Sequence, residues 1–402
     1  MKNIKREKYL NQIRPFYNQQ LIKVLTGQRR VGKSFILKQI ADELKLNNKD
    51  NNLIYIDKEL HKFKFIQDDE HLIAYVKQNS KPQHNVLLID EIQEIKEFER
   101  ALRSLLSEEI YDIYCTGSNS HIFSGELATF LSGRQIVFHI HSLSYPEYLE
   151  FHQLPSSTAA VMQFLKYGGL PYLLNLPKED AIVFDYLKNI MSTIVYRDVI
   201  ARHQIRDVSF FDDLISYIAD NTGSLVSANK ISEYLKSQKI NKSVSVVIDY
   251  LGYLENANII HKVKRKDIQG KKIFEIGDKF YFEDLGLRNV INGYRPADIN
   301  KILENAVFNH LQYLGYKINI GKSEQREIDF IAEKNNEIVY FQVAYILTDD
   351  KVIEREFGNL DKINDHYPKY VISMDEFPIN TSYKGIKHLK LIDFLYSETI
   401  SS

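Results

Sequence analysis

The segment at residues 27–34 reads GQRRVGKS, a set of residue types and spacings that can bind a nucleotide phosphate. Its two glycines let the backbone wrap closely enough for successive N–H groups to face phosphate oxygens. Lys33 is placed to reach the β- and γ-phosphates, and the Ser34 hydroxyl to ligate Mg²⁺. The sequence therefore predicts a nucleotide site. Its expected contact residues are Gly27, Gln28, Arg29, Arg30, Val31, Gly32, Lys33, Ser34 and Phe35.

Two acidic residues end a second apolar run, NVLLIDE at residues 85–91. An apolar strand followed by carboxylates is typical of the second half of an ATP site, in which Asp90 would hold Mg²⁺ directly or through water. Glu91 is then placed to accept a proton from the attacking water. Either carboxylate could instead cap the helix expected near residues 97–107. No guanine-reading Asn/Thr-Lys-x-Asp motif follows, which favours ATP over GTP.

Small polar residues follow the next expected strand, and an arginine precedes the strand after it. The run at 109–115 ends in TGSNS, and ligands lie beyond the carboxyl ends of parallel strands. Ser118 or Asn119 is the candidate for orienting the lytic water, and a helix cap is an equal alternative for each. Arg134 precedes the strand expected at 135–140 and could act on the γ-phosphate of a neighbouring subunit. A solvated arginine at the strand edge fits the same spacing.

The elements that would position these residues alternate between strand and helix from residue 21 to about 142, the pattern of a parallel α/β sheet. The 402-residue chain is long enough for two or three domains. Its net charge of −1 gives no overall basic excess, so any contact with nucleic acid needs a local patch. Cys115 is the single cysteine, which fits a reducing compartment. Neither a signal-peptide pattern nor a membrane-length apolar run occurs, so we expect a cytoplasmic protein without membrane contact.

The pattern changes near residue 222, where two helical stretches and a hairpin around 267–270 predict a winged helix. Residues 230–280 hold 11 Lys or Arg against 6 Asp or Glu, a local net charge of +5. The candidate DNA contacts are Lys242, Lys264, Arg265, Lys266, Lys271 and Lys272. Because the second helix is mostly apolar, contact with phosphates of duplex DNA is favoured over base reading. Protein binding is an equally weighted role for such a module.

The order of motifs resembles the prokaryotic AAA+-like ATPases of the archaeal-ATPase and STAND-related type. GQRRVGKS, LLIDEIQ, TGSNS and LSGR carry the resemblance, which continues through YPEYLEF, YGGLPYLL and IVYRDVI. It implies a helical lid after the core, with Pro171 of the Gly169-Leu170-Pro171 turn beside the nucleotide base. A plain helix-breaking turn is the simpler interpretation of that proline.

The C-terminal part resembles the restriction-endonuclease-like fold. A helical run carries Glu304, three strands follow, and Asp329 lies on the second of them. Gln342 and Ala344 stand where that fold's acidic residue and lysine would be. The resemblance therefore implies a degenerate nuclease site of Glu304, Asp329 and Gln342 that does not cut DNA, because Gln342 adds no charge and Ala344 cannot activate water. Lys322 is a candidate substitute for the missing lysine.

Together these patterns predict an α/β chain in four parts. They are an ATPase core at 1–142, a helical lid at 143–218, a winged helix at 219–290 and a nuclease-like domain at 291–402. The expected function is an ATP-hydrolysing switch of AAA+ type that controls the winged helix and the C-terminal module. An ATP-binding interaction protein with negligible turnover and an ATP-regulated DNA nuclease are the alternatives. Double-stranded DNA, a protein partner and a second copy of the chain are the candidate partners.

Overall fold

The computed structural model describes residues 4–82, 84–118, 133–237, 240, 242–268, 277–323, 326–347, 350–375 and 382–400. The candidate residues Asn119, Lys271 and Lys272 lie outside these ranges. The chain divides into two compact units, which we describe separately. The first comprises residues 1–141 and 256–258, and the second comprises residues 142–255 and 259–402.

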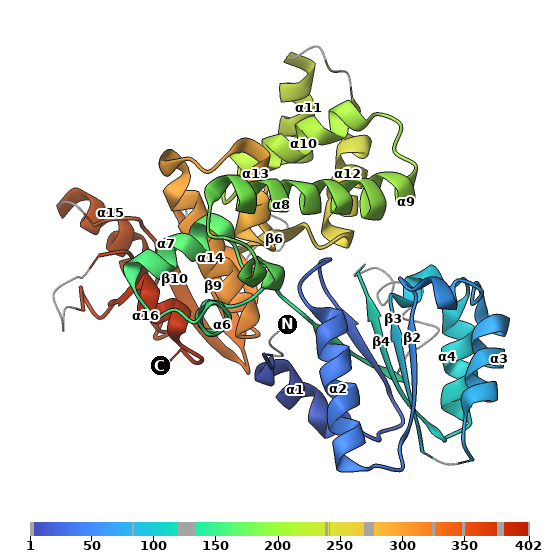
Figure 1. The fold of residues 1–402 in the computed structure, drawn as a ribbon. Coiled ribbons are helices and arrows are strands. Elements are labelled where there is room, and N and C mark those ends of the chain that lie inside the picture. Colours follow the sequence, from blue (N-terminus) through green and yellow to red (C-terminus); the bar gives the residue numbers. More distant parts are fainter. Residues whose placement is uncertain are drawn as a thin grey trace. The chain divides into compact units, whose positions relative to one another are not determined.

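The first unit is built on a parallel five-stranded sheet in the order β2-β3-β4-β1-β5. The strands are β1 (Ile22–Thr26), β2 (Asn52–Asp57), β3 (Asn85–Asp90), β4 (Tyr111–Gly117) and β5 (Gln135–His139). Its helices are α1 (Glu7–Ile13), α2 (Lys33–Asn47), α3 (Asp69–Asn79) and α4 (Phe98–Ser107). Helices α1 and α2 lie on one side of the sheet, and α3 and α4 on the other (Figure 1).

The helices on both faces of this sheet bury its central strands. Every residue of β1, β3 and β4 is buried, as expected for parallel strands with helices on both faces. Strand β4 is inserted between β1 and β3, although β2 and β3 precede it in the sequence. Because all the strands are parallel, their carboxyl ends share one edge of the sheet. The end of β4 therefore lies between the segment after β1 and the acidic residues after β3.

The second unit contains a mixed seven-stranded sheet in the order β12-β11-β10-β9-β8-β6-β7. Its strands are β6 (Ile260–Asp267), β7 (Asp278–Phe282), β8 (Lys317–Ser323), β9 (Arg326–Lys334), β10 (Glu337–Val343), β11 (Lys369–Ser373) and β12 (Lys387–Lys390). The hairpin strands β6 and β7 pair antiparallel, and β6 also pairs parallel with β8. The strands of the expected winged helix and those of the expected nuclease-like domain therefore belong to one sheet.

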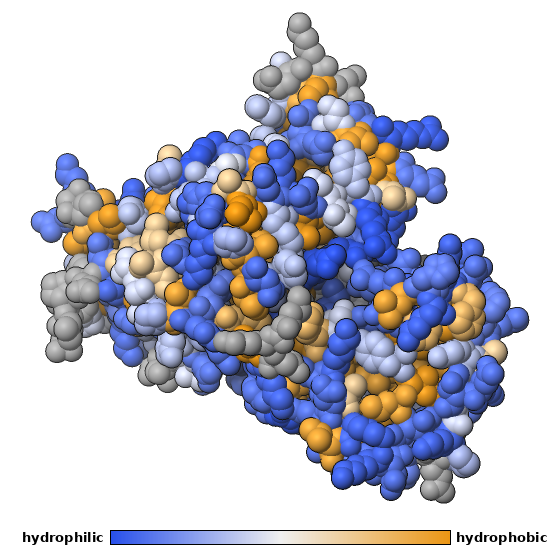
Figure 2. Space-filling model, in the orientation of Figure 1, coloured by the Kyte–Doolittle hydropathy of each residue, from blue (hydrophilic) through white to orange (hydrophobic). Residues whose placement is uncertain are grey.

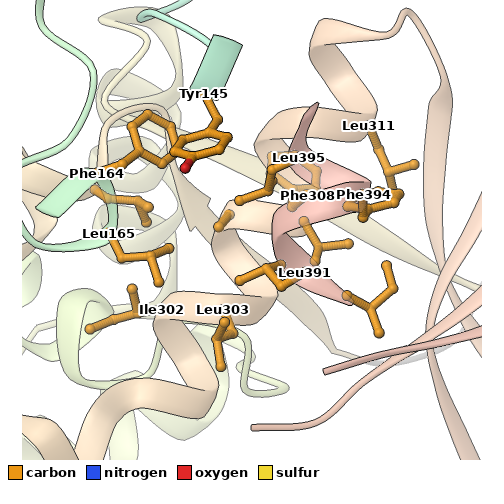
Figure 3. Packing of buried hydrophobic residues seen from close by; sticks show 14 of the residues in the cluster. Tyr145, Phe164, Leu165, Ile302, Leu303, Phe308, Leu311, Leu391, Phe394 and Leu395 are labelled. Atoms are coloured by element: carbon orange, nitrogen blue, oxygen red, sulfur yellow. The ribbon is translucent and has the colours of Figure 1, made fainter. Parts of the chain in front are cut away.

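The second unit also contains many helices. They are α6 (Tyr145–His152), α7 (Thr158–Tyr167), α8 (Asp180–Thr193), α9 (Ala201–His203), α10 (Val208–Asp220), α11 (Ala228–Ser237), α12 (Val244–Asn256), α13 (Leu285–Asn292), α14 (Ile299–Tyr313), α15 (Asp350–Asp361) and α16 (Leu391–Tyr396). Residues Ile194–Ile200 continue α8 as a π-helix. A large apolar cluster joins α6, α7, α14 and α16, and Figure 3 shows Tyr145, Phe164, Phe308 and Phe394 within it. Segments more than 200 residues apart in sequence therefore share one core.

Hydrophilic residues cover most of the face in Figure 2, with smaller hydrophobic areas between them. Within the part of the chain that the structure describes, no helix combines the length and the apolar character needed to cross a membrane.

His152, at the end of α6, is expected to make the second unit sensitive to acid. Burial, together with nearby Lys178, lowers the pKa of His152 from 6.5 to about 4. The folded state therefore holds a neutral imidazole, and stability is lost as pH falls from 6.5 towards 4, where the unfolded chain takes up the proton first. We expect a loss of about 2 kcal/mol at pH 5 relative to pH 7.5.

Urea unfolding of the wild type and of His152→Phe at both pH values would measure this. The phenylalanine preserves a ring beside Tyr148, whose centroid lies 4.3 Å from that of His152. The pH dependence of the variant should be weaker by about the same 2 kcal/mol. Equal pH dependence in the two proteins would contradict the assignment to His152.

Candidate nucleotide-binding site

The loop between β1 and α2 adopts a backbone conformation that depends on its glycines. Gly27 has a φ of +140° and Gly32 a φ of +99°, and Arg30 between them has a φ of +72°. A Cβ atom on Gly27 would lie 2.2 Å from the carbonyl oxygen of Ile140, so a larger residue does not fit there. The loop thus has the tight curvature that a phosphate cradle needs.

Lys33 begins α2 and folds back over this loop. Its ammonium donates to the carbonyl oxygens of Gly27 and Gln28, at 2.9 Å each, and the residue is only 4% exposed. An anion in the cradle would accept a charge-assisted hydrogen bond from this ammonium. The position of Lys33 therefore fits phosphate binding.

Gln28 is fully buried inside the loop, and neither atom of its amide has a hydrogen-bond partner among the described residues. A buried amide without partners is costly in a folded protein. Such an orphaned group next to the cradle fits a loop shaped around a ligand.

Asp90, the last residue of β3, lies beside the start of α2. Its Oδ1 accepts a hydrogen bond of 2.5 Å from Thr116 Oγ1, and the Ser34 hydroxyl also hydrogen-bonds its carboxylate. Burial raises the pKa of Asp90 above its ordinary value, although these two hydroxyl bonds act in the opposite direction. A buried carboxylate beside a serine hydroxyl is an oxygen-rich pair suited to Mg²⁺. The predicted metal ligands Ser34 and Asp90 are thus brought together.

Glu91 follows Asp90 in a left-handed backbone conformation, with a φ of +55°. Its backbone N–H donates to Thr116 Oγ1 at 2.9 Å, so a single threonine at the end of β4 holds both acidic residues. A non-glycine residue with positive φ is strained, and such strain clusters at functional sites. The hydrogen bond from its backbone N–H to Thr116 holds Glu91 in this conformation.

Two further side chains contact the Glu91 carboxylate. Gln93 Nε2 donates both to it and to Ser118 Oγ, the latter at 3.3 Å. Arg29 Nη2 lies 4.0 Å from Glu91 Oε2, while Arg29 Nη1 lies 3.2 Å from Glu59 Oε1. Of the two candidates for orienting water, Ser118 is thus linked to Glu91 through Gln93, and Asn119 lies outside the described residues.

Sequence reasoning missed Thr116, Gln93 and Glu59 as parts of this site. Thr116 directly follows the run at 109–115, at the position where side chains reach the ends of parallel strands, but its contacts with Asp90 and Glu91 depend on the strand order. The roles of Gln93 and Glu59 depend on which segments meet beyond the strand ends, and nothing in their local sequence indicates that. Among the remaining loop candidates, Val31 is buried, whereas Arg30 and Phe35 are exposed.

Arg134 lies far from this cluster within the first unit. It precedes β5, and its carbonyl accepts the backbone N–H of Ile22 at the start of β1. The phosphate loop follows the other end of β1, so Arg134 is at the opposite edge of the sheet from its own chain's loop. Action on a neighbouring subunit stays a prediction, as does the placement of Pro171, which begins a 3₁₀ helix in the second unit.

Two of the four described DNA-contact candidates form ion pairs within the second unit. Lys242 pairs with Asp207 at 2.5 Å, and Lys266 pairs with Glu333. Lys264 is exposed on β6, and Arg265 next to it is half-buried. The local net charge of +5 therefore overstates the positive charge that these residues offer to a partner.

Two of the three residues predicted for a degenerate nuclease site contact the same side chain, and that site stays a prediction. Glu304 and Asp329 both contact the ammonium of Lys279, a residue that sequence reasoning did not select. Gln342 Oε1 is buried with no hydrogen-bond partner among the described residues. Lys322 lies at the end of β8, opposite Glu327 in the strand register.

Comparison with known proteins agrees with the architecture of the first unit. A family model described as an AAA domain matches residues 19–149, and a domain of unknown function (DUF8612) matches residues 158–298. An uncharacterized protein of Haemophilus influenzae is 35% identical over 98% of both chains. An uncharacterized protein of Methanocaldococcus jannaschii is 30% identical over 85% of this chain and 78% of its own.

The chain belongs to the same family as these two proteins. Its first unit contains an AAA domain of the P-loop type. Among solved structures, the ORC1 protein of Aeropyrum pernix in complex with DNA has a TM-score of 0.35 and 12% identity, covering 71% of this chain and 91% of its own. The replication initiator DnaA bound to AMPPCP and single-stranded DNA has a TM-score of 0.33 and 16% identity, covering 62% and 88%. At these TM-scores the likeness carries no functional argument.

Proposed function

We propose that this AAA-domain protein binds Mg-ATP and hydrolyses it as a molecular switch. The observation that carries the proposal is the convergence of Lys33, Ser34, Asp90 and Glu91 at one edge of the parallel sheet, with Thr116 holding both acidic residues. An AAA domain matched over these residues supports the same function.

Each group has a separate role in the proposed reaction. The loop backbone and Lys33 bind the phosphates, and the Ser34 hydroxyl and Asp90 carboxylate hold Mg²⁺. Bound Mg²⁺ would neutralise charge that develops on the phosphate oxygens. Glu91 accepts a proton from the attacking water. Ser118, linked to Glu91 through Gln93, helps to orient that water.

The switch would act through the rest of the chain. Helices α11 and α12 followed by the hairpin β6–β7 have the order of a winged helix, and α14 followed by β8, β9 and β10 has the order expected for the nuclease-like module. We assign the four predicted parts accordingly. The nucleotide state would alter the binding of duplex DNA or of a protein by these modules in the cytoplasm, and Arg134 would complete the site of a second copy.

Phosphate release from Mg-ATP by the purified full-length protein tests the proposal. We expect turnover by the wild type and a fall of about 100-fold or more in Lys33→Ala, because the variant loses the cation that stabilises the transferring phosphate. Lys77→Ala, which removes an exposed lysine on α3, is the matched control and should keep the wild-type rate. Repeating the assay with duplex DNA tests the winged helix, since stimulation would indicate that it senses DNA.

The same assay separates the alternatives. Wild-type protein that binds ATP but releases phosphate no faster than Lys33→Ala would contradict the hydrolytic switch and support an ATP-binding interaction protein. Equal ATP affinity of the wild type and Lys33→Ala would contradict the proposed binding of ATP by the phosphate loop.

A further inference from the structure

A short segment between α12 and β6 belongs to the first unit, although both of these elements lie almost entirely in the second. The segment is Asn256–Asn258. Asn256 is the last residue of α12, and β6 begins at Ile260. Ala257 and Asn258 are each only 3% exposed. Because three residues span at most about 10 Å, this connection has little slack.

The residue that follows the segment, Ile259, is fixed by two backbone hydrogen bonds. Its N–H donates to the carbonyl oxygen of Leu254 at 3.0 Å, which closes the end of α12. Its carbonyl oxygen accepts the N–H of Glu283 at 3.1 Å, directly after β7. The segment is therefore followed at once by a residue that is bonded both to α12 and to the end of the hairpin β6–β7.

Asn258 has a left-handed backbone conformation, with a φ of +53°. Glycine and asparagine are the residues that most readily adopt this conformation where a helix ends. A helix cap alone therefore explains the backbone of Asn258, but not its buried amide. The Asn258 Nδ2 donates to the backbone carbonyl oxygen of Ser118 at 3.4 Å, and Ser118 is only 2% exposed. The amide thus makes a contact that a helix cap does not require.

Ser118 connects this contact to the acidic side of the nucleotide site. Ser118 directly follows β4, and its Oγ accepts a hydrogen bond of 3.3 Å from Gln93 Nε2. The same Nε2 donates to the Glu91 carboxylate. Two residues before Ser118, Thr116 Oγ1 accepts the backbone N–H of Glu91 at 2.9 Å. Asn258 therefore holds the backbone of a residue whose side chain is linked to Glu91.

We propose that Asn258 is a positioning residue for the ATP reaction and couples the nucleotide site to α12 and the hairpin β6–β7. By holding the Ser118 carbonyl, its amide fixes the end of β4 from which the attacking water is oriented. A ligand of α12 or of the hairpin would then act on the reaction through this one contact. The inference rests on the proposed hydrolysis of ATP and adds the route by which that reaction is regulated.

Replacing Asn258 by glycine keeps the left-handed cap of α12 and removes only the amide. We expect kcat for ATP to fall about threefold to tenfold while KM changes by less than about twofold, because the lost hydrogen bond positions the site and does not bind the substrate. Asn258→Asp keeps the size of the side chain but has no N–H to donate, and should be at least as slow. Asn335→Gly is the matched control, since Asn335 has a φ of +52° in the exposed turn between β9 and β10. It should keep the wild-type kcat.

Hydrogen exchange of the full-length protein with and without Mg-AMPPCP measures the coupling without hydrolysis. In the wild type, this ATP analogue should slow exchange at least about twofold both in the phosphate loop and in residues 254–262. In Asn258→Gly it should protect the phosphate loop alone. Both segments are followed in one experiment, so a failure of ATP binding and a failure of the coupling give different results.

Four results would overturn the inference. The first is a kcat of Asn258→Gly and Asn258→Asp within about twofold of the wild type. The second is an equal fall of kcat in Asn335→Gly, because the loss would then be unrelated to the contact with Ser118. The third is wild-type protein in which AMPPCP protects the phosphate loop but not residues 254–262. Protection of neither segment would contradict ATP binding itself, and the inference would fall with it.

Discussion

Replacing Glu91 by glutamine is expected to lower ATP turnover by about 10² to 10⁴-fold while ATP affinity changes by less than about threefold. The carboxylate is the group that can accept a proton from the attacking water, and an amide cannot. Glutamine keeps the size of the side chain and an oxygen that can accept the hydrogen bond from Gln93. The backbone N–H that donates to Thr116 is unchanged, so the strained conformation at this position is retained.

Single-turnover hydrolysis and equilibrium binding of a fluorescent ATP analogue separate the two effects. Glu94→Gln is the matched control, because Glu94 lies three residues further on and is exposed. It should hydrolyse ATP at the wild-type rate. Turnover by Glu91→Gln close to that of the wild type would contradict the role of Glu91 as the base and would point to water activation by another group.

The proposed reaction also gives a reason for the charges around Glu91. Arg29 lies between Glu59 and Glu91, 3.2 Å from the first carboxylate and 4.0 Å from the second. The guanidinium of Arg29 therefore places a positive charge beside the carboxylate that we propose as the base. The phosphate loop therefore makes two contributions to the site. Its backbone forms the phosphate cradle, and Arg29 places a cation beside Glu59 and Glu91.

The phosphate loop, Asp90 and Glu91 could be predicted because their chemistry depends on short segments. Gly27, Gly32 and Lys33 are fixed in spacing by one loop, and the two acidic residues directly end one apolar strand. The role of Thr116 could not be predicted, because it requires β4 to lie between β1 and β3. Strand order is set by the packing of the whole unit and not by the sequence near Thr116.

In the second unit, too, contacts that depend on the order of the strands could not be predicted from the sequence. Glu304 and Asp329 were selected from the expected order of elements, but Lys279, 25 residues before Glu304, was counted only as one of the basic residues of the hairpin. Lys279 contacts Glu304 and Asp329 because β6 pairs with β8 over a few residues, which brings the hairpin into the C-terminal sheet. A count of charges along the sequence also does not show that Lys242 and Lys266 form ion pairs with Asp207 and Glu333.

The ion pair of Lys23 with Asp112 lies within the sheet that carries the phosphate loop, and breaking it should destabilise the first unit. Both residues are buried, and the Lys23 ammonium also donates to the carbonyls of Gln19 and Leu21 at 2.9 and 2.8 Å. Burial lowers the pKa of Lys23, although the carboxylate opposes the change. We expect Lys23→Met to cost about 3 to 5 kcal/mol, because it leaves Asp112 buried without its cation.

Urea unfolding of the double variant Lys23→Met/Asp112→Asn distinguishes a lost cation from poor packing. The asparagine is neutral and keeps an oxygen for the Tyr114 hydroxyl and the Asn18 N–H, which donate to Asp112 Oδ2 at 2.8 and 3.0 Å. The double variant should therefore be about 2 kcal/mol more stable than Lys23→Met alone. A double variant no more stable than the single one would mean that the methionine itself does not fit between β1 and β4. Because Lys23 lies near the start of β1 and the phosphate loop follows its end, the folded fraction of either variant should still bind ATP, so this pair supports the sheet without taking part in the chemistry.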